Sequence, residues 1–154
     1  MSSVSYVQCF IDGAARNQGS GRQVDSAAAC VIYRNKKEIV RFARPIGSVS
    51  NNAAEYEALI QCLLICSMSD FYRPIIYSDS AVVVNHTKGI WKCRTENLLP
   101  YYLTVKQIQQ EFPFDIHQVP RDKVWQADQL CNVALDQLEE QRDLMRLAPA
   151  RNET

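Results

Sequence analysis

Several features that define other classes of protein are scarce in this sequence. It has only two histidines, and none of its six cysteines form a Cys-x-x-Cys motif. Neither a zinc site nor a disulfide framework is therefore indicated. No uncharged apolar run approaches the roughly 20 residues that a membrane-spanning helix needs. The start lacks the basic region, apolar stretch and cleavage site of a signal peptide. We therefore expect a cytoplasmic protein, away from membranes, whose cysteines are mostly small core residues.

The length and the charge of the chain limit its organisation. Its 154 residues suffice for one domain, which we expect over residues 1–146, with a flexible tail over 147–154. The 17 basic residues balance 17 acidic ones, so the chain as a whole is not built to adhere to polyanions. No obligatory protein partner is evident in the sequence, and we expect a monomer.

Hydrophobic periodicity predicts three strands before any helix. Alternating apolar residues predict a strand over 4–12, and runs of apolar or β-branched residues predict strands over 27–33 and 39–46. The elements expected after them are a helix from about 51 to 70, a strand at 75–78, a helix at 80–88, a helix with Leu99, Leu103, Ile108 and Phe112 on its apolar side, a strand at 114–119 and a helix from about 123 to 146.

This order, βββαβααβα, predicts an α/β fold with a five-stranded mixed sheet. The first three strands are expected to form an antiparallel meander, with a polar turn at 34–37 between the second and the third. Helical crossovers make the later strands parallel, and they place helices on both faces of the sheet.

Four acidic residues fall where such a scaffold presents ligands. Asp12 ends the first strand, before an expected small-residue turn at 13–15. Asp79 follows the strand at 75–78, at the carboxyl end where open sheets bind ligands. Glu55 shares the apolar side of the first helix, and Asp128 lies near the start of the last. Each alone can be a helix cap or a dipole partner. Together, clustered carboxylates would need cations to neutralise them.

The motifs that carry these acids resemble those of type 1 ribonuclease H, in order, over about residues 4–138. They are Phe10-Ile11-Asp12-Gly13-Ala14-Ala15, Asn51-Asn52-Ala53-Ala54-Glu55, Tyr77-Ser78-Asp79-Ser80, and Val119-Pro120-Arg121 with Ala127-Asp128-Gln129-Leu130. The match is to compact variants without the basic protrusion that some members insert after the third motif. The resemblance implies a ribonuclease H-like fold.

The resemblance also implies an activity and its metal ions. The reaction is hydrolysis of the RNA strand of an RNA/DNA hybrid duplex, which leaves 5′-phosphate and 3′-hydroxyl ends. Two Mg²⁺ ions, for which Mn²⁺ can substitute, would be held by Asp12, Glu55, Asp79 and Asp128. By family resemblance Asp12 bridges the ions. Glu55 and Asp79 then hold the ion nearer the departing 3′-oxygen, and Asp128 the ion that orients the attacking water.

Selectivity for RNA requires contacts to 2′-hydroxyl groups, and a polar run beside Glu55 offers them. Helix capping explains that run equally well. No histidine stands in the loop before the last motif, where many family members have one, and we expect Arg121 to assist turnover there. The candidate substrate-binding residues are Gly13, Ala14, Asn17, Gln18, Ser50, Asn51, Asn52, Trp91 and Arg121.

Two other interpretations stay open at this point. The chain could be a non-catalytic module that binds RNA/DNA hybrids on the same fold, or the ribonuclease H module of a reverse transcriptase. The presence of all four acids favours an enzyme. The initial Met1 and the short tail favour a free-standing protein.

Overall fold

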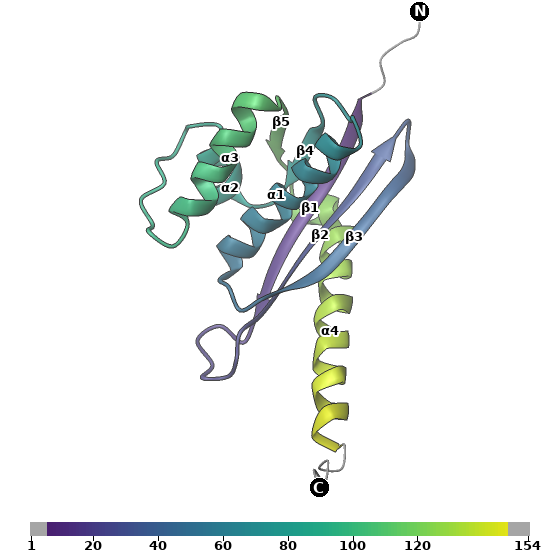
Figure 1. Ribbon diagram of the computed structural model, residues 1–154, viewed down its shortest axis with the longest axis vertical. Helices are drawn as coiled ribbons and strands as arrows, with labels where there is room; N and C mark the ends of the chain where they lie inside the picture. Colours follow the sequence, from purple (N-terminus) through teal and green to yellow (C-terminus); the bar gives the residue numbers. More distant parts are fainter. Residues whose placement is uncertain (1–5, 148–154) are drawn as a thin grey trace, which may run out of the picture.

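A computed structural model describes residues 6–147 of the chain, so the predicted tail over 147–154 lies outside the described residues except for Leu147, which ends the last helix. Its strands are β1 (Val7–Arg16), β2 (Asp25–Arg34), β3 (Lys37–Gly47), β4 (Ile75–Ser78) and β5 (Asp115–Gln118); its helices are α1 (Asn51–Met68), α2 (Ala81–Thr87), α3 (Leu99–Glu111) and α4 (Trp125–Leu147), with a 3₁₀ turn, η1 (Arg121–Val124), before α4 (Figure 1). None of the helices in this part of the chain combines the length and the apolar character that crossing a membrane requires.

The predicted mixed sheet is confirmed, with the strand order β3-β2-β1-β4-β5. β1, β2 and β3 pair antiparallel, whereas β4 is parallel to both β1 and β5. In the β1–β4 pair Phe10 lies opposite Tyr77. Asp12 and Asp79 each follow two residues later, so the register brings these two acids to the same edge of the sheet.

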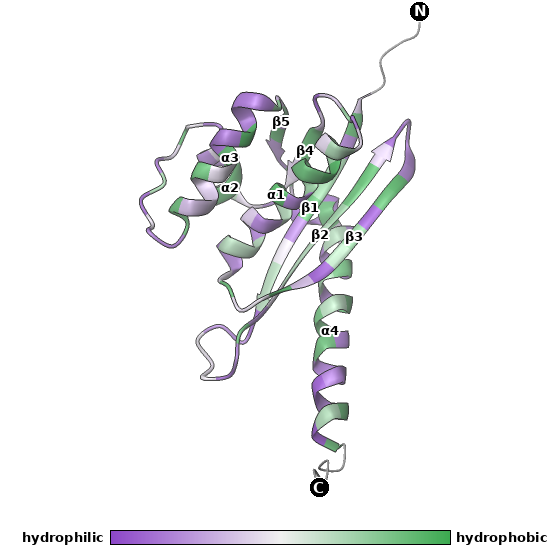
Figure 2. Ribbon diagram, in the orientation of Figure 1, coloured by the Kyte–Doolittle hydropathy of each residue, from purple (hydrophilic) through white to green (hydrophobic). Residues whose placement is uncertain are grey.

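Helices cover both faces of the sheet and bury two apolar clusters. α1 packs against β1 and β2 on one face, with α2 and α3 beside it, and the side chains between them form the larger cluster. α4 packs on the other face, against β1, β2 and β3, over small residues such as Ala27 and Ala29. The C-terminal turns of α4, mixed purple and green in Figure 2, project past the sheet.

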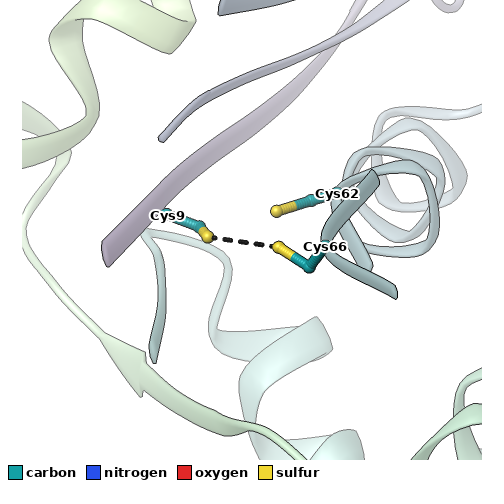
Figure 3. A group of neighbouring side chains, drawn as sticks. All are labelled: Cys9, Cys62 and Cys66. Carbon is teal, nitrogen blue, oxygen red and sulfur yellow. Dashed lines mark hydrogen bonds between the residues drawn. The ribbon is translucent and has the colours of Figure 1, made fainter. Parts of the chain in front are cut away.

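Three cysteines meet in the larger cluster. Cys9 of β1 faces Cys62 and Cys66 of α1, and the Sγ atoms of Cys9 and Cys66 are 3.7 Å apart (Figure 3). All six cysteines of the chain are free, and only Cys93 among them is not buried. The prediction that the cysteines are mostly core residues is confirmed, but their convergence was not predicted, because sequence spacing does not show which strand residue faces a helix.

The small-residue turn expected at 13–15 is wrong, because β1 continues to Arg16. Gly13, Ala14 and Ala15 pair in register with Ala28, Ala27 and Ser26 of β2. Small side chains serve here to bring α1 close: a Cβ added to Gly13 would lie 2.2 Å from the carbonyl carbon of Ala54. The segment is extended, and its composition reflects packing against a helix.

Two expectations about the later helices also need correction. Leu99 and Leu103 are 41% and 55% exposed, so they do not form the apolar side of α3. The residues that pack inward are Leu98, Tyr101, Val105, Ile108 and Phe112, which recur at three- and four-residue intervals. The last helix begins at Trp125 and not at about residue 123, because η1 first forms a tighter turn.

The close approach of α1 to β1 predicts a large effect of one methyl group. Gly13→Ala should lower the free energy of unfolding by about 3 kcal/mol or more, because backbone atoms of α1 must move to admit the Cβ. Urea denaturation measures the change. Gly19→Ala is the control: no atom lies within 4 Å of its Cβ position, so only the backbone at φ +71° contributes, about 1 kcal/mol. Equal losses in the two variants would contradict the argument.

Candidate active site

Three of the four predicted acids converge. Asp12 at the middle of β1, Glu55 of α1 and Asp79 just after β4 each bring a carboxylate oxygen to within 4.8 Å of the others. Asp12 and Glu55 are 5% and 4% exposed, so their charges lie largely out of water. Carboxylates so placed repel one another and are stable together only when protons or cations neutralise them.

Glu55 is held by one oxygen and leaves the other without a partner. The backbone N–H of Gly13 donates to its Oε1 at 3.0 Å. Its Oε2 is buried and has no hydrogen-bond partner among the described residues. An unpartnered carboxylate oxygen in a buried position is costly, and it is the kind of oxygen that a hard divalent cation binds.

Asp128, the fourth predicted acid, lines the same cavity of about 300 Å³ as the other three. It projects from the first turn of α4, and its Oδ1 is 3.5 Å from Nη2 of Arg121 in η1. Arg121 also lines the cavity, with a side chain that is 78% exposed. The cavity therefore combines four acidic side chains with one largely exposed arginine.

The carboxylates have altered proton affinities. Burial raises the pKa of Asp12 from 3.8 to about 7, and the negative charge of Asp79 acts in the same direction. Burial, followed by the charge of Asp12, raises the pKa of Glu55 well above its usual value. Burial also raises the pKa of Asp79, although the positive charge of Arg121 opposes this change. The site therefore favours bound positive charge, either as protons or as metal ions.

Four of the predicted substrate-binding residues lie at this cavity besides Arg121. Gly13 and Ala14 line it from β1, and Asn51 and Asn52 from the first turn of α1. The side-chain oxygen of Asn51 accepts a hydrogen bond from the N–H of Ala15 at 3.3 Å, which ties the start of α1 to β1. Asn52 is exposed, and its side chain is available to a ligand.

The other predicted substrate-binding residues are not among those that line the cavity. Ser50 caps α1 by accepting from the N–H of Ala53 at 3.2 Å. Gln18 accepts from the N–H of Asn51 at 3.0 Å, and Asn17 donates to the carbonyl of Gln23 at 3.2 Å. Trp91, in the connection from α2 to α3, is 47% exposed. Their roles toward a substrate stay predictions.

Sequence reasoning did not select three residues of the cavity wall, Ser80, Ala81 and Val82. They form the start of α2, where the Ser80 side chain accepts from the N–H of Val83 at 3.2 Å. Their position directly after Asp79 could have predicted that they line the site, because the connection that leaves the carboxyl end of a strand borders the ligand site in open sheets.

Comparison with known proteins places the chain in a family. Residues 12–134 match the family described as reverse transcriptase-like. The chain belongs to this family. The fold is ribonuclease H-like, and the resemblance to type 1 ribonuclease H is confirmed.

Relatives of this reverse transcriptase-like domain include ribonucleases H. Ribonuclease HI of Halobacterium salinarum is 30% identical over 132 residues, which cover 84% of this chain and 64% of that protein. A bifunctional protein of Mycobacterium tuberculosis is 33% identical over 130 residues, but the chain spans only about a third of its length, 34%. The structure of LC11-RNase H1 in complex with RNA/DNA hybrid superposes with a TM-score of 0.78 at 27% identity, covering 86% of this chain and 98% of that one.

The raised pKa of Asp12 predicts how stability depends on pH when divalent metal is chelated. A group with a raised folded-state pKa binds protons more tightly when folded, so the free energy of unfolding should fall as pH rises from about 4 to about 7. Asp12→Asn should flatten this dependence and, at pH 7, unfold at or above the wild-type temperature. Thermal melts over that range in chelator measure both effects. A variant clearly less stable than wild type at pH 7 would mean that Asp12 has a structural role.

Proposed function

We propose that the chain is an endoribonuclease that hydrolyses the RNA strand of RNA/DNA hybrids by a two-metal-ion mechanism and leaves 5′-phosphate and 3′-hydroxyl ends. The observation that carries the proposal is the buried carboxylate cluster with its unpartnered Glu55 Oε2, in a member of a family that includes ribonucleases H.

The donor set fits hard divalent cations. All four acids offer carboxylate oxygens, and no cysteine or histidine lines the cavity among the described residues. Such oxygen ligands suit Mg²⁺ and also Mn²⁺. When bound, these ions would activate a water, relieve charge on the phosphate oxygens and stabilise the departing 3′-oxygen. Asp12, Glu55, Asp79 and Asp128 are the residues that would hold them.

The remaining residues of the cavity position the nucleic acid. Ala14 lines the cavity with only a small side chain, so a sugar–phosphate backbone can approach the acids closely there. The exposed amide of Asn52 can both donate to and accept from a 2′-hydroxyl, the group that distinguishes RNA from DNA. Arg121 brings a positive charge to the cavity opening, beside Asp128, where a phosphate would pass.

A hybrid duplex is the substrate that best accounts for this arrangement. A relative of the same fold, LC11-RNase H1, has been crystallised with RNA/DNA hybrid. One strand must be RNA for Asn52 to contact ribose hydroxyls near the scissile phosphate. We expect a monomer to suffice, because all four acids come from one chain.

Cleavage assays on matched duplexes test this proposal. Wild type should cut RNA/DNA in Mg²⁺ or Mn²⁺, leave RNA/RNA and DNA/DNA intact, and stop in chelator. Asp79→Asn should lower the rate by about a thousandfold or more, because one ligand and its charge are lost. Asp115→Asn, which changes an exposed aspartate at the start of β5, is the matched control and should cut normally.

Two results would contradict parts of the proposal. Tight binding of the hybrid by wild type, without cleavage in either metal, would favour a non-catalytic hybrid-binding module. Wild-type cleavage by Asp79→Asn would remove that residue from the metal site.

Arg121 should assist turnover without being essential. Arg121→Ala should lower kcat on the hybrid by about tenfold, the effect of losing one charged contact to the reacting phosphate or the leaving product. Single-turnover and steady-state rates at saturating hybrid separate these two steps. Arg41→Ala, an exposed arginine of β3, is the control. An unchanged kcat for Arg121→Ala would leave this arginine as a surface residue.

A further inference from the structure

A row of aromatic rings crosses the sheet away from the carboxylate cavity. Phe10 of β1 stacks on Tyr77 of β4, with ring centroids 5.0 Å apart and an interplanar angle of 20°. Tyr33 of β2 meets the other side of Phe10 edge-on at 5.8 Å, and His117 of β5 lies 5.9 Å from Tyr77. The row therefore spans four strands.

This row lies on the sheet face opposite α1. Along β1, Val7, Cys9 and Ile11 are buried in the cluster under α1, so the alternate residues Phe10 and Asp12 face the other way. α4 packs on β1, β2 and β3 on this side, and Figure 1 shows it running away from β4 and β5. The aromatic row and the catalytic Asp12 thus share one face.

A cavity of about 440 Å³ opens at the β2 end of the row. Its aromatic walls are Phe10, Tyr33 and Trp125, the first residue of α4, which is 58% exposed. Two amide side chains, those of Gln8 and Gln126, line it as well. The Tyr33 hydroxyl donates to Oε1 of Gln126, which leaves the Gln126 NH₂ group free to donate to a ligand.

The charges at this cavity are mainly positive. Lys36 and Lys123 line it, against the single acid Asp122. Lys36 belongs to the two-residue turn between β2 and β3, and Lys37 follows it as the first residue of β3. Flat rings, amides and lysines together match a nucleotide: rings stack on bases, amides bond to base edges, and ammonium groups pair with phosphates. An apolar peptide would leave the lysines and amides without partners.

We propose that this cavity, with the aromatic row beside it, binds an unpaired nucleic-acid strand that continues from the duplex at the catalytic site. η1 separates the two sites: Arg121 lines the carboxylate cavity, and the next two residues, Asp122 and Lys123, line the aromatic one. The origin of the strand in a hybrid substrate rests on the proposed function. The affinity of the cavity for unpaired strand does not.

Binding of a single strand in chelator tests the proposal without any cleavage. The probe is a labelled oligouridine, which cannot pair with itself, followed by fluorescence anisotropy with the full chain. Trp125→Ala should weaken binding by about tenfold, the loss of one stacked base. Because Trp125 is 58% exposed, this variant should fold. Tyr72→Ala removes an aromatic side chain that is 69% exposed and lies outside the cavity; as the matched control it should bind like wild type.

A second variant tests the phosphate contacts. Lys123→Gln should reduce the slope of log affinity against log salt by about 0.7, the value for one phosphate contact to a single strand. A hybrid with a single-stranded extension should also bind more tightly than a blunt hybrid, and Trp125→Ala should remove the difference.

Several outcomes would overturn the proposal. Equal oligouridine affinity of wild type and Trp125→Ala would exclude stacking in this cavity. If Arg121→Ala loses oligouridine binding and Trp125→Ala keeps the wild-type affinity, the strand lies in the carboxylate cavity instead. A dimer that Trp125→Ala converts to monomer, with oligouridine binding unchanged, would make the surface an interface between copies. Failure of wild type to cut hybrids would overturn the proposed function alone, because the single-strand measurement does not use cleavage.

Discussion

The contact between α1 and the middle of β1 is the constraint on which the site depends. Because Gly13 has no side chain, the backbone at Ala54 comes closer to β1 than any Cβ would allow. The same approach lets the Gly13 N–H bind one oxygen of Glu55, which holds this carboxylate within 4.8 Å of those of Asp12 and Asp79. One backbone contact therefore sets both the packing of the main helix and the position of a carboxylate. Small residues in the core between α1 and β1, such as Cys9 and Cys62, allow this close approach of the helix.

The site works against the stability of the fold that holds it. Burial and mutual repulsion raise the pKa values of Asp12 and Glu55, which means that their ionised forms are unfavourable in the folded chain. The rest of the domain must supply the compensating free energy through its two apolar clusters. Cation binding to the folded form alone would reverse the penalty by mass action. The burial of neighbouring carboxylates thus both destabilises the metal-free fold and gives the site its affinity for cations.

The positions of the acids were predictable, because they depend on strand order and helix face. Parallel pairing of β1 with β4 carries Asp12 and Asp79 to one edge, and Glu55 follows the apolar side of α1. The inward face of α3 was not predictable, since Leu99 is as apolar as the buried Val105 and only tertiary packing chooses between them. Asn17 and Gln18 lie in a loop whose hydrogen bonds depend on distant partners, such as Asn51. The aromatic cavity is lined by residues from 8–36 and from 122–126, which are far apart in the sequence, so no local sequence pattern predicts it.

The short turn η1 borders both the carboxylate cavity and the aromatic cavity. Its first residue, Arg121, places a cation against Asp128 and opposes the rise that burial causes in the pKa of Asp79, while its next two residues border the aromatic cavity. Its last residue, Val124, is buried and anchors the turn to the domain. A 3₁₀ turn of four residues is tightly wound, so its residues are held close together along the backbone. The turn therefore fixes where the backbone of Arg121 stands relative to that of Lys123, and with it the spacing of the positive charges that the two cavities receive from η1.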